Sequence, residues 1–389
     1  MPELFLTIFF ISILLIFLGT GIWVALSMVG VSAIGMLLFT SRPVGDAMAT
    51  TIWGTSSSWT LTALPLFVWM GEILFRTKLS ENLFKGLAPW MSRLPGGLVH
   101  VNVVGCALFA AISGSSAATV ATVGKMSIPE LRKRNYPEKL LLGSLAGSGT
   151  LGLLIPPSII LIIYGVTVQE SIAKLFIAGI IPGIMIAIFF MFYVIGWSIL
   201  NKDSMPKTEE TFSFSQKMKD SRQLIPVIVL IAAVIGSIYV GIATATEAAS
   251  LGVVGALILS FFQKSLNKET FKLSLLGATK TSCMIAFILA GSSFLSLAMG
   301  FTGLPRGLAI WIQEMNLSPY VLILVLTIFY IILGMFLDGI SAVVLTMAII
   351  EPMIRQAGFD MIWFGVFLVI VVEMAQITPP VGFNLFVLQ

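Results

Sequence analysis

Charged side chains are scarce in this chain of 389 residues, where Asp, Glu, Lys and Arg together make up only 10%. Soluble domains average about 25%, and 58% of the residues here are hydrophobic. These residues form long uninterrupted runs, and apolar runs of about 18 or more residues are typical of transmembrane helices. The composition excludes a soluble domain and predicts an all-α polytopic membrane protein.

Reactive and metal-binding side chains are equally few. The two cysteines, Cys106 and Cys283, lie in apolar segments and predict neither a disulfide framework nor a metal cluster. The single histidine, His100, has no acid or serine partner at motif spacing, so an intramembrane enzyme is not indicated. The sequence has no GxxxxGK[ST] motif, which argues against ATP hydrolysis. We therefore expect no enzyme, no organic cofactor and no nucleic-acid partner.

Positive charge indicates how the chain crosses the membrane. Lys and Arg cluster in segments 76–93 and 125–139, and such loops stay in the cytoplasm. Segment 78–93 also repeats leucine at every fourth position, which predicts an amphipathic helix at the membrane surface, with an ordinary loop helix as the alternative. We expect full spans near residues 4–20, 22–40, 61–75, 137–165, 171–200, 223–243, 246–263 and 281–299, cytoplasmic linkers at 201–222 and 264–280, and segment 303–317 outside.

Two apolar segments do not fit as pairs of spans. Segment 94–124 has both ends on the predicted cytoplasmic side, yet it is shorter than the roughly 40 residues that two spans need. It is predicted to be a re-entrant hairpin with ISGSSAAT (112–119) at its tip. Segment 319–350, broken by LDGIS (337–341), is predicted to enter from the outside in the same way. Serine and glycine suit a tip inside protein or beside water, although close helix packing is an alternative reading.

The two halves of the sequence resemble each other. Four short motifs recur in the same order at offsets of 220 to 224 residues, among them SSAATVAT (115–122) with GISAVVLT (339–346) and IPPS (155–158) with TPPV (378–381). Five predicted spans separate equivalent points, so the second copy is inverted, as in many secondary transporters. The predicted organisation is a first repeat at 1–200 with hairpin 94–124 and broken helix 137–165, a linker at 201–222, and a second repeat at 223–389 with hairpin 319–350, a broken helix from 361 and an apparently truncated end.

Both halves contain a proline pair behind a glycine-rich or polar run. GSGTLGLLIPPS (147–158) and EMAQITPPVGFN (373–384) should unwind their helices, because proline cannot donate a backbone hydrogen bond. The freed carbonyls and nearby hydroxyls are hard oxygen ligands for a small cation such as sodium. The tips and breaks contain no Lys or Arg, so an anionic substrate would be held by helix N-termini, hydroxyls and bound cations.

The motifs ISGSSAATVATVG, GTLGLLIPPS, LDGISAVVLT and ITPPVGFNLFV together resemble the large, DctM-like membrane subunit of tripartite ATP-independent periplasmic (TRAP) transporters, over essentially the whole chain. The resemblance implies a multi-pass protein of a bacterial or archaeal inner membrane, with a transport domain that moves like an elevator against a scaffold. It also implies symport of a small carboxylate with two or more sodium ions, a small four-helix membrane subunit and a periplasmic substrate-binding protein.

The same resemblance assigns roles to individual residues. It implies that Ser113, Ser158 and Asp338 lie in the substrate region. It implies that the sodium sites are made by Ser115, Ser116, Gly149, Gly152, Ile155, Pro157, Gly339, Ala375, Thr378 and Val381. The leading hypothesis is a sodium-coupled importer of a C4-dicarboxylate or sialic-acid-like substrate delivered by a binding protein. The alternative is a stand-alone sodium–dicarboxylate symporter without a binding protein.

Overall fold

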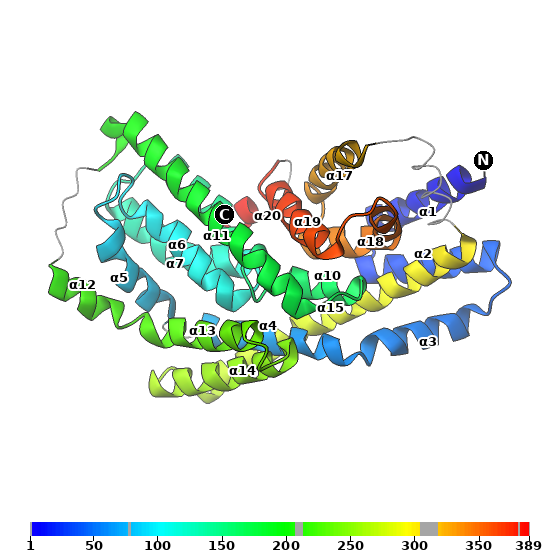
Figure 1. The fold of residues 1–389 in the computed structure, drawn as a ribbon, viewed down its shortest axis with the longest axis horizontal. Helices are drawn as coiled ribbons and strands as arrows, with labels where there is room; N and C mark the ends of the chain where they lie inside the picture. The colour runs from blue at the N-terminus through cyan, green and yellow to red at the C-terminus, as the bar shows by residue number, and fades with distance from the viewer. Residues whose placement is uncertain (1, 77–78, 207–212, 304–317, 380–381, 389) are drawn as a thin grey trace.

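The computed structural model describes residues 2–76, 79–206, 213–303, 318–379 and 382–388, and these ranges contain helices, turns and short connections but no β-strand (Figure 1). The first half contains α1 (Pro2–Gly19), α2 (Val24–Phe39), α3 (Val44–Ser56), η1 (Trp59–Thr62), α4 (Ala63–Phe75), α5 (Leu79–Met91), α6 (Val99–Ser113), α7 (Ser116–Lys133), α8 (Glu138–Gly149), α9 (Leu151–Leu154), α10 (Ile159–Thr167) and α11 (Ile172–Leu200). The remainder contains η2 (Lys202–Ser204), α12 (Phe214–Ser221), α13 (Ile225–Tyr239), α14 (Ala245–Phe262), α15 (Lys268–Thr302), α17 (Pro319–Gly334), α18 (Gly339–Gln356), α19 (Met361–Gln376) and α20 (Phe383–Val387). The all-α prediction is confirmed.

Several helices are long and apolar enough to cross a membrane. Five stretches qualify, namely 138–167, α11, α14, α15 and α18, and two bent pairs, α3 with η1–α4 and α12 with α13, raise the number to seven. The surface of α11 exposes large apolar side chains, with Ile181 75% and Leu200 85% exposed. Water would oppose so extended an apolar surface, whereas lipid would cover it. The chain is therefore a multi-pass membrane protein.

The helices differ from the predicted spans in two places. Helix α3 was not predicted, because polar residues such as Asp46 and Thr50 interrupt its apolar pattern. Helix α15 is one continuous helix of 35 residues, so the predicted linker 264–280 and span 281–299 belong to the same element. Its polar first turns are capped by the side chain of Asn267, which accepts a hydrogen bond from Thr270 N at 2.7 Å. Most of the predicted outside segment 303–317 falls outside the described residues.

A framework of helices packed through glycines supports the molecule. Helix α2 lies along α15, α14 lies along α4, and α4 also contacts α15. At the first contact, a Cβ on Gly291 would lie 2.8 Å from the Ala25 carbonyl oxygen, and at the second, a Cβ on Gly252 would lie 2.5 Å from Met70 Sδ. Only glycine allows backbones to approach so closely, as in other membrane helix pairs.

Each predicted hairpin segment contains a helix–turn–helix. In the first, Val123 Cγ1 of α7 lies 3.7 Å from the position of a Cβ on Gly105 of α6, so the two arms run antiparallel. In the second, Tyr330 Oη of α17 and Thr346 Oγ1 of α18 are hydrogen-bonded at 2.6 Å. Both second arms continue beyond the predicted ends at 124 and 350, so part of the basic segment 125–139 is helical rather than loop. Basic residues in a last helical turn interact favourably with the helix dipole.

The amphipathic segment 78–93 contains helix α5, whose apolar residues face protein. Leu83 and Leu87 are 3% and 6% exposed, and α5 contacts α6, α7 and α12. Lys85 is exposed. The predicted helix is confirmed, whereas its place at the membrane surface stays a prediction.

Candidate functional site

The tip of the first hairpin is a tight turn built from serines and one glycine. Gly114 adopts the left-handed conformation with φ of 62°, and Ser115 is the N-cap of α7. Ser113 Oγ lies 2.8 Å from Thr119 Oγ1, and Thr119 Oγ1 donates to the Ser115 carbonyl at 2.7 Å. The three hydroxyl-bearing residues therefore form one local network around the start of α7.

This tip contacts the break between α9 and α10. Ile159 N donates to the Gly114 carbonyl at 3.2 Å, and a Cβ on Gly114 would lie 2.6 Å from the Pro157 carbonyl oxygen. A Cβ on Gly152 would likewise lie 2.6 Å from the Ser115 carbonyl oxygen. The structure thus brings two backbone carbonyls from the tip and one from the break into a small region.

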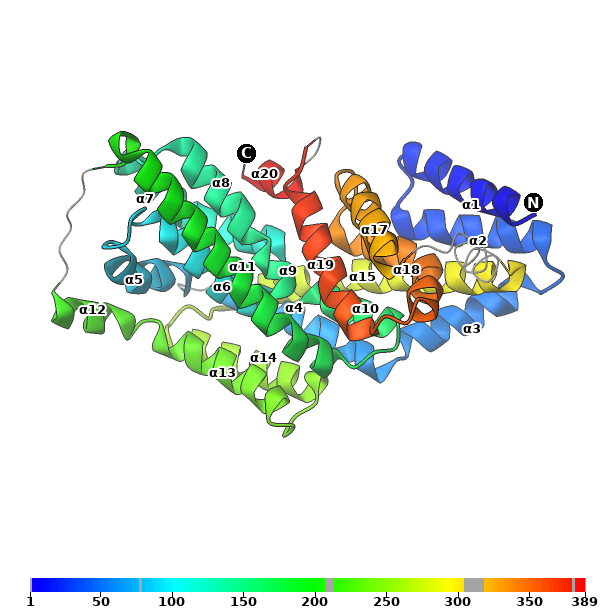
Figure 2. The same ribbon diagram turned by 45° about the horizontal axis from the view of Figure 1, so that its top comes forward.

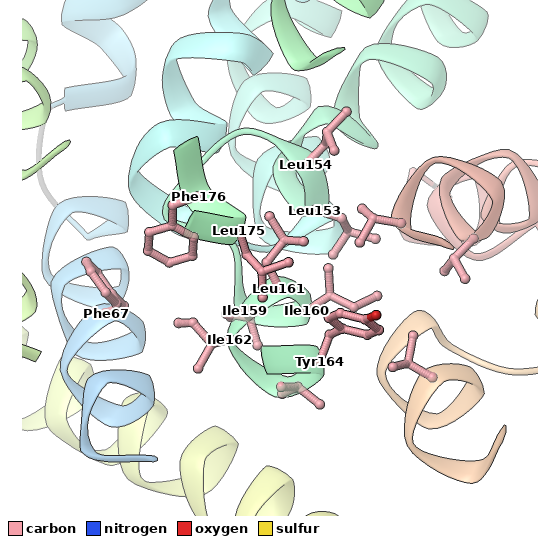
Figure 3. Close-up of a cluster of buried hydrophobic side chains, with 14 of the residues drawn as sticks. Phe67, Leu153, Leu154, Ile159, Ile160, Leu161, Ile162, Tyr164, Leu175 and Phe176 are labelled. Atoms are coloured by element: carbon pink, nitrogen blue, oxygen red, sulfur yellow. The ribbon is translucent and has the colours of Figure 1, made fainter. Parts of the chain in front are cut away.

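Residues 155–158 interrupt the long stretch from α8 to α10. Ile155 is extended, and Ser158 is the N-cap of α10, where its Oγ accepts from Leu161 N at 3.2 Å and donates to the Leu153 carbonyl. Apolar side chains from both sides of the break, together with Phe67 and Phe176, pack around it (Figure 3). This core fixes the position of the break, and Ser158 is fully buried with its hydroxyl already bonded to the backbone.

The tip of the second hairpin is capped by an acid. Asp338 is the N-cap of α18, and its Oδ2 accepts from Ile340 N and Ser341 N, both at 3.1 Å. The next residue, Gly339, packs against α19, because a Cβ there would lie 2.7 Å from Gln376 Nε2 and 2.8 Å from Val372 Cγ1. In Figure 2, α9, α19 and the second hairpin follow one another across the middle of the molecule.

Gln376, the last residue of α19, connects the two tips. Its Oε1 accepts from Ser116 Oγ at 3.0 Å, and its Nε2 lies against Gly339. Ser116 and Gly339 are the first residues of α7 and α18. The N-terminal ends of two helices of 18 residues therefore meet on either side of one buried carboxamide.

Comparison with known proteins identifies the family. A sequence profile of the DctM component of the tripartite ATP-independent periplasmic transporters matches residues 9–389. The chain belongs to this family. This confirms the resemblance inferred from the motifs, and it identifies the protein as a transporter permease rather than an enzyme.

Named relatives of the permease come from several bacteria. The C4-dicarboxylate TRAP transporter large permease protein DctM of Pseudomonas aeruginosa is 32% identical, over 91% of this chain and 82% of the relative. The 2,3-diketo-L-gulonate TRAP transporter large permease protein of Escherichia coli is 31% identical over 86% and 78%. The isethionate TRAP transporter permease protein DctMQ of Oleidesulfovibrio alaskensis is 30% identical over 96% of this chain and 58% of that longer protein.

The remaining predicted site residues of the permease lie around these contacts. Gly149 packs on α7, because a Cβ there would lie 2.0 Å from Val120 Cγ2, and Ala375 lies one residue before Gln376, against Gly334. Thr378 Oγ1 donates to the Met374 carbonyl at 2.6 Å, which leaves its lone pairs available. Val381 lies outside the described residues. The structure therefore brings Ser113, Ser115, Gly152 and Pro157 together at the first tip, with Ser116 bonded to Gln376. Gly149 packs further along α7, and the side chain of Ile155 packs against Gly183 of α11. Gly339 and Ala375 lie beside Gln376.

Gln376 itself was missing from the predicted site. The only signal in the sequence was a polar side chain in an apolar run just before the second proline pair. A second omission is Thr119, which bonds to Ser113 within the tip. Neither residue can be assigned from spacing, because the role of each depends on partners that the fold brings close.

The first tip and the break offer neutral oxygens, and the second tip adds the Asp338 carboxylate. Among the described residues, no group of three or more His, Cys, Asp or Glu side chains is arranged to hold a metal ion. A cation at this site would therefore be held by carbonyl and hydroxyl oxygens, which suit hard cations. Glu373 lies one turn before Gln376, is 4% exposed, and its Oε1 has no hydrogen-bond partner among the described residues.

A polar cavity of about 760 Å³ opens next to the framework. It lies between the α3–η1 bend, the α10–α11 connection, the start of α14 and the middle of α15, and its lining includes the hydroxyls of Thr60, Thr167 and Thr246. Glu170 also lines it and pairs with Arg355 of α18 at 3.8 Å. In the predicted topology these connections face the outside.

Proposed function

We propose that the permease imports a small carboxylate, such as a C4-dicarboxylate or a sialic-acid-like acid, together with two or more sodium ions. The meeting of the α7 and α18 N-termini at Gln376 carries this proposal. The positive ends of two helix dipoles converge there. The Asp338 carboxylate already accepts from two N–H groups of α18, so a substrate anion would rely on the α7 end, where it needs no Lys or Arg. The names of the relatives, which specify C4-dicarboxylate, 2,3-diketo-L-gulonate and isethionate, point to the same class of small organic anions.

Sodium coupling is supported by the oxygen-rich surroundings of both tips. The carbonyls of Ser115 and Pro157 and the hydroxyl network at Ser113 lie together at the first tip, and Ser116 contributes a further hydroxyl. We propose one cation site at each tip, with ligands drawn from the predicted sodium residues of that half. Bound cations would neutralise the substrate carboxylate in a region that offers no basic side chain. Substrate binding would therefore depend on sodium binding, which is what symport requires.

An inverted repeat accounts for matching geometry in the two halves. The N-caps Ser115 and Asp338 lie 223 residues apart, within the offsets of the repeat, and the left-handed residues Asn135 and Gly358 follow the corresponding helices α7 and α18 at the same offset. Near the start of each half, Gly21 and Gly241 adopt φ of 81° and 78° in equivalent turns. In such a repeat α2 corresponds to α14 and α4 to α15, so the α2–α15 contact matches the α14–α4 contact. These parallels support repeats at 1–200 and 223–389 joined by the linker 201–222.

An elevator mechanism follows from this organisation. In our proposal, α2, α4, α14 and α15 belong to the scaffold, and the hairpins with α8–α10 and α19 form the moving transport domain. The polar cavity lies where these two parts meet on the predicted outer face. Substrate would enter by that route, bind at the tips with sodium, and leave on the other side after the transport domain has shifted.

Partners follow from the family. We propose that the permease works in a bacterial inner membrane with a small four-helix subunit and a periplasmic binding protein that delivers the carboxylate. The relative named DctMQ is considerably longer than this chain, which agrees with a second membrane component joined to the large one. A stand-alone sodium–dicarboxylate symporter is the second candidate, because the proposed tips and breaks make no use of another chain.

Reconstitution distinguishes the two candidates. The permease is incorporated into liposomes with its small subunit under an inward sodium gradient, and uptake of labelled succinate or sialic acid is measured with and without the binding protein. The main proposal requires uptake that depends on both sodium and the binding protein. Uptake without the binding protein supports the stand-alone symporter, and uptake that ignores the sodium gradient rules out both.

A further inference from the structure

A second pocket lies away from the tips, on the side predicted to be cytoplasmic. It has a volume of about 690 Å³ and is formed by α5, α7 and α12. Trp90 of α5 holds α12 in place, because its Nε1 donates to Ser221 Oγ at 2.7 Å and Lys217 Nζ lies 5.4 Å from its ring centroid. The pocket is therefore walled by three helices that pack against one another.

The pocket combines an apolar half with unpaired positive charge. Phe84, Ala88 and Met126 contribute apolar surface. Lys85 and Lys125 line the pocket, and neither forms an ion pair with any residue that the structure describes. The other charged residues of the lining are Arg134 and Glu130, which pair with each other at 3.7 Å, and Asp220. Such a lining matches a molecule that joins an anionic group to an apolar body.

Two prolines add hydrogen-bond acceptors at the same place. Pro89 lies inside α5 and Pro129 inside α7, and both line the pocket. Proline has no N–H, so neither residue can donate to the carbonyl four residues before it. Those carbonyls belong to Lys85 and Lys125, the two unpaired lysines. Each lysine can therefore offer an ammonium donor from its side chain and a carbonyl acceptor from its backbone.

We propose that this pocket binds a phospholipid of the cytoplasmic leaflet whose headgroup carries both a phosphate and a hydrogen-bond donor. Phosphatidylglycerol and phosphatidylethanolamine have this chemistry. The ammonium groups of Lys85 and Lys125 bind the phosphate, the freed carbonyls accept from the headgroup hydroxyl or ammonium, and the apolar residues contact the glycerol and upper acyl chains. Phosphatidylcholine has the phosphate but no O–H or N–H donor in its headgroup, so it binds less well.

Native mass spectrometry of the purified full-length permease tests this proposal, with the three lipids supplied at equal acyl-chain length. We expect phosphatidylglycerol and phosphatidylethanolamine to bind more tightly than phosphatidylcholine. Replacing both lysines, Lys85→Gln with Lys125→Gln, should weaken their binding by about 25-fold, since each surface lysine contributes a factor of about five. The matched control, Lys264→Gln with Lys268→Gln, changes two exposed lysines of the same predicted face outside the pocket and should leave binding unchanged.

A second variant tests the carbonyls separately. Pro129→Ala restores the missing N–H without changing charge, so the preference over phosphatidylcholine should shrink while the lysines still bind phosphate. Equal binding of all three lipids by the wild-type protein overturns the proposal, as does unchanged binding in the double lysine variant. Displacement of phosphatidylglycerol by millimolar glycerol 3-phosphate also overturns it, because the occupant would then be a soluble phosphate. None of these measurements depends on sodium-coupled transport.

Discussion

Replacing Gln376 by leucine removes the hydrogen bond between the first hairpin tip and the end of α19, beside Gly339 of the second tip, while keeping a side chain of similar size. The hydrogen bond from Ser116 Oγ to Gln376 Oε1 is 3.0 Å long, and both residues are 3% exposed. A neutral buried hydrogen bond contributes about 0.5–1.5 kcal/mol net, and an unsatisfied partner costs about 1–3 kcal/mol. The hydroxyl can partly compensate by turning to a backbone carbonyl of its own helix. We therefore expect a loss of about 1–2 kcal/mol in the coupling between the tips.

This loss should appear in the sodium dependence of uptake. A coupling of about 1–2 kcal/mol corresponds to a factor of about 5–30, so Gln376→Leu should raise the sodium concentration for half-maximal uptake by that factor and lower the steepness of the titration. Gln376→Glu should impair uptake further, because a tethered carboxylate between two helix N-termini competes with the substrate.

The assay is a sodium titration of substrate uptake in proteoliposomes that contain the small subunit, with the binding protein supplied. Gln263→Leu, which alters a glutamine at the C-terminal end of α14, is the matched control and should titrate like wild type. A Gln376→Leu variant with the wild-type midpoint and steepness would refute the reasoning that the carboxamide connects the tips.

Three further predictions concern the tips. Ser113→Ala and Asp338→Ala should each cripple uptake while the protein still reaches the membrane, as measured by transport and by immunoblot of membrane fractions; wild-type rates would remove both residues from the substrate region. Ser116→Ala and Thr378→Val should weaken the response to sodium, and an unchanged sodium titration would contradict their assignment. Gly114→Ala should lower the melting temperature of the detergent-solubilised protein, because a left-handed φ of 62° and a carbonyl 2.6 Å from the new Cβ both oppose it. Strain of this kind costs about 1–3 kcal/mol, and a melting curve identical to wild type would contradict this account.

The turns of the two helix–turn–helix segments lie inside the polar stretches ISGSSAAT and LDGIS that the sequence singled out, whereas the membrane face from which each enters stays a prediction. The basic clusters on either side of 94–124 required a short segment to return to the same face, and the structure has its turn at Gly114 and Ser115, inside the predicted ISGSSAAT. The proline pair likewise marked the real break between α9 and α10. These features could be predicted because backbone hydrogen bonding and charge act locally along the chain.

Other features could not be predicted because they depend on packing. The polar residues 268–280 resembled a loop, yet contacts with α4 and α2 continue them into α15. Helix α3 is too polar to register as a span on its own. The importance of Gln376 depends on a contact with Ser116, 260 residues away in the chain. The ligands of each cation stay a prediction from the family resemblance.

The unbroken length of α15 has a mechanical consequence. At about 1.5 Å per residue, its 35 residues make a rod of about 52 Å, well beyond the roughly 30 Å of hydrocarbon that a helix must cross. Such a helix must tilt steeply or project into the aqueous phase. The helices α2 and α4, which pack along it, would then be tilted in the same way. In the proposed elevator mechanism, the transport domain would then move relative to α15 by bending of the connections that join it to this helix.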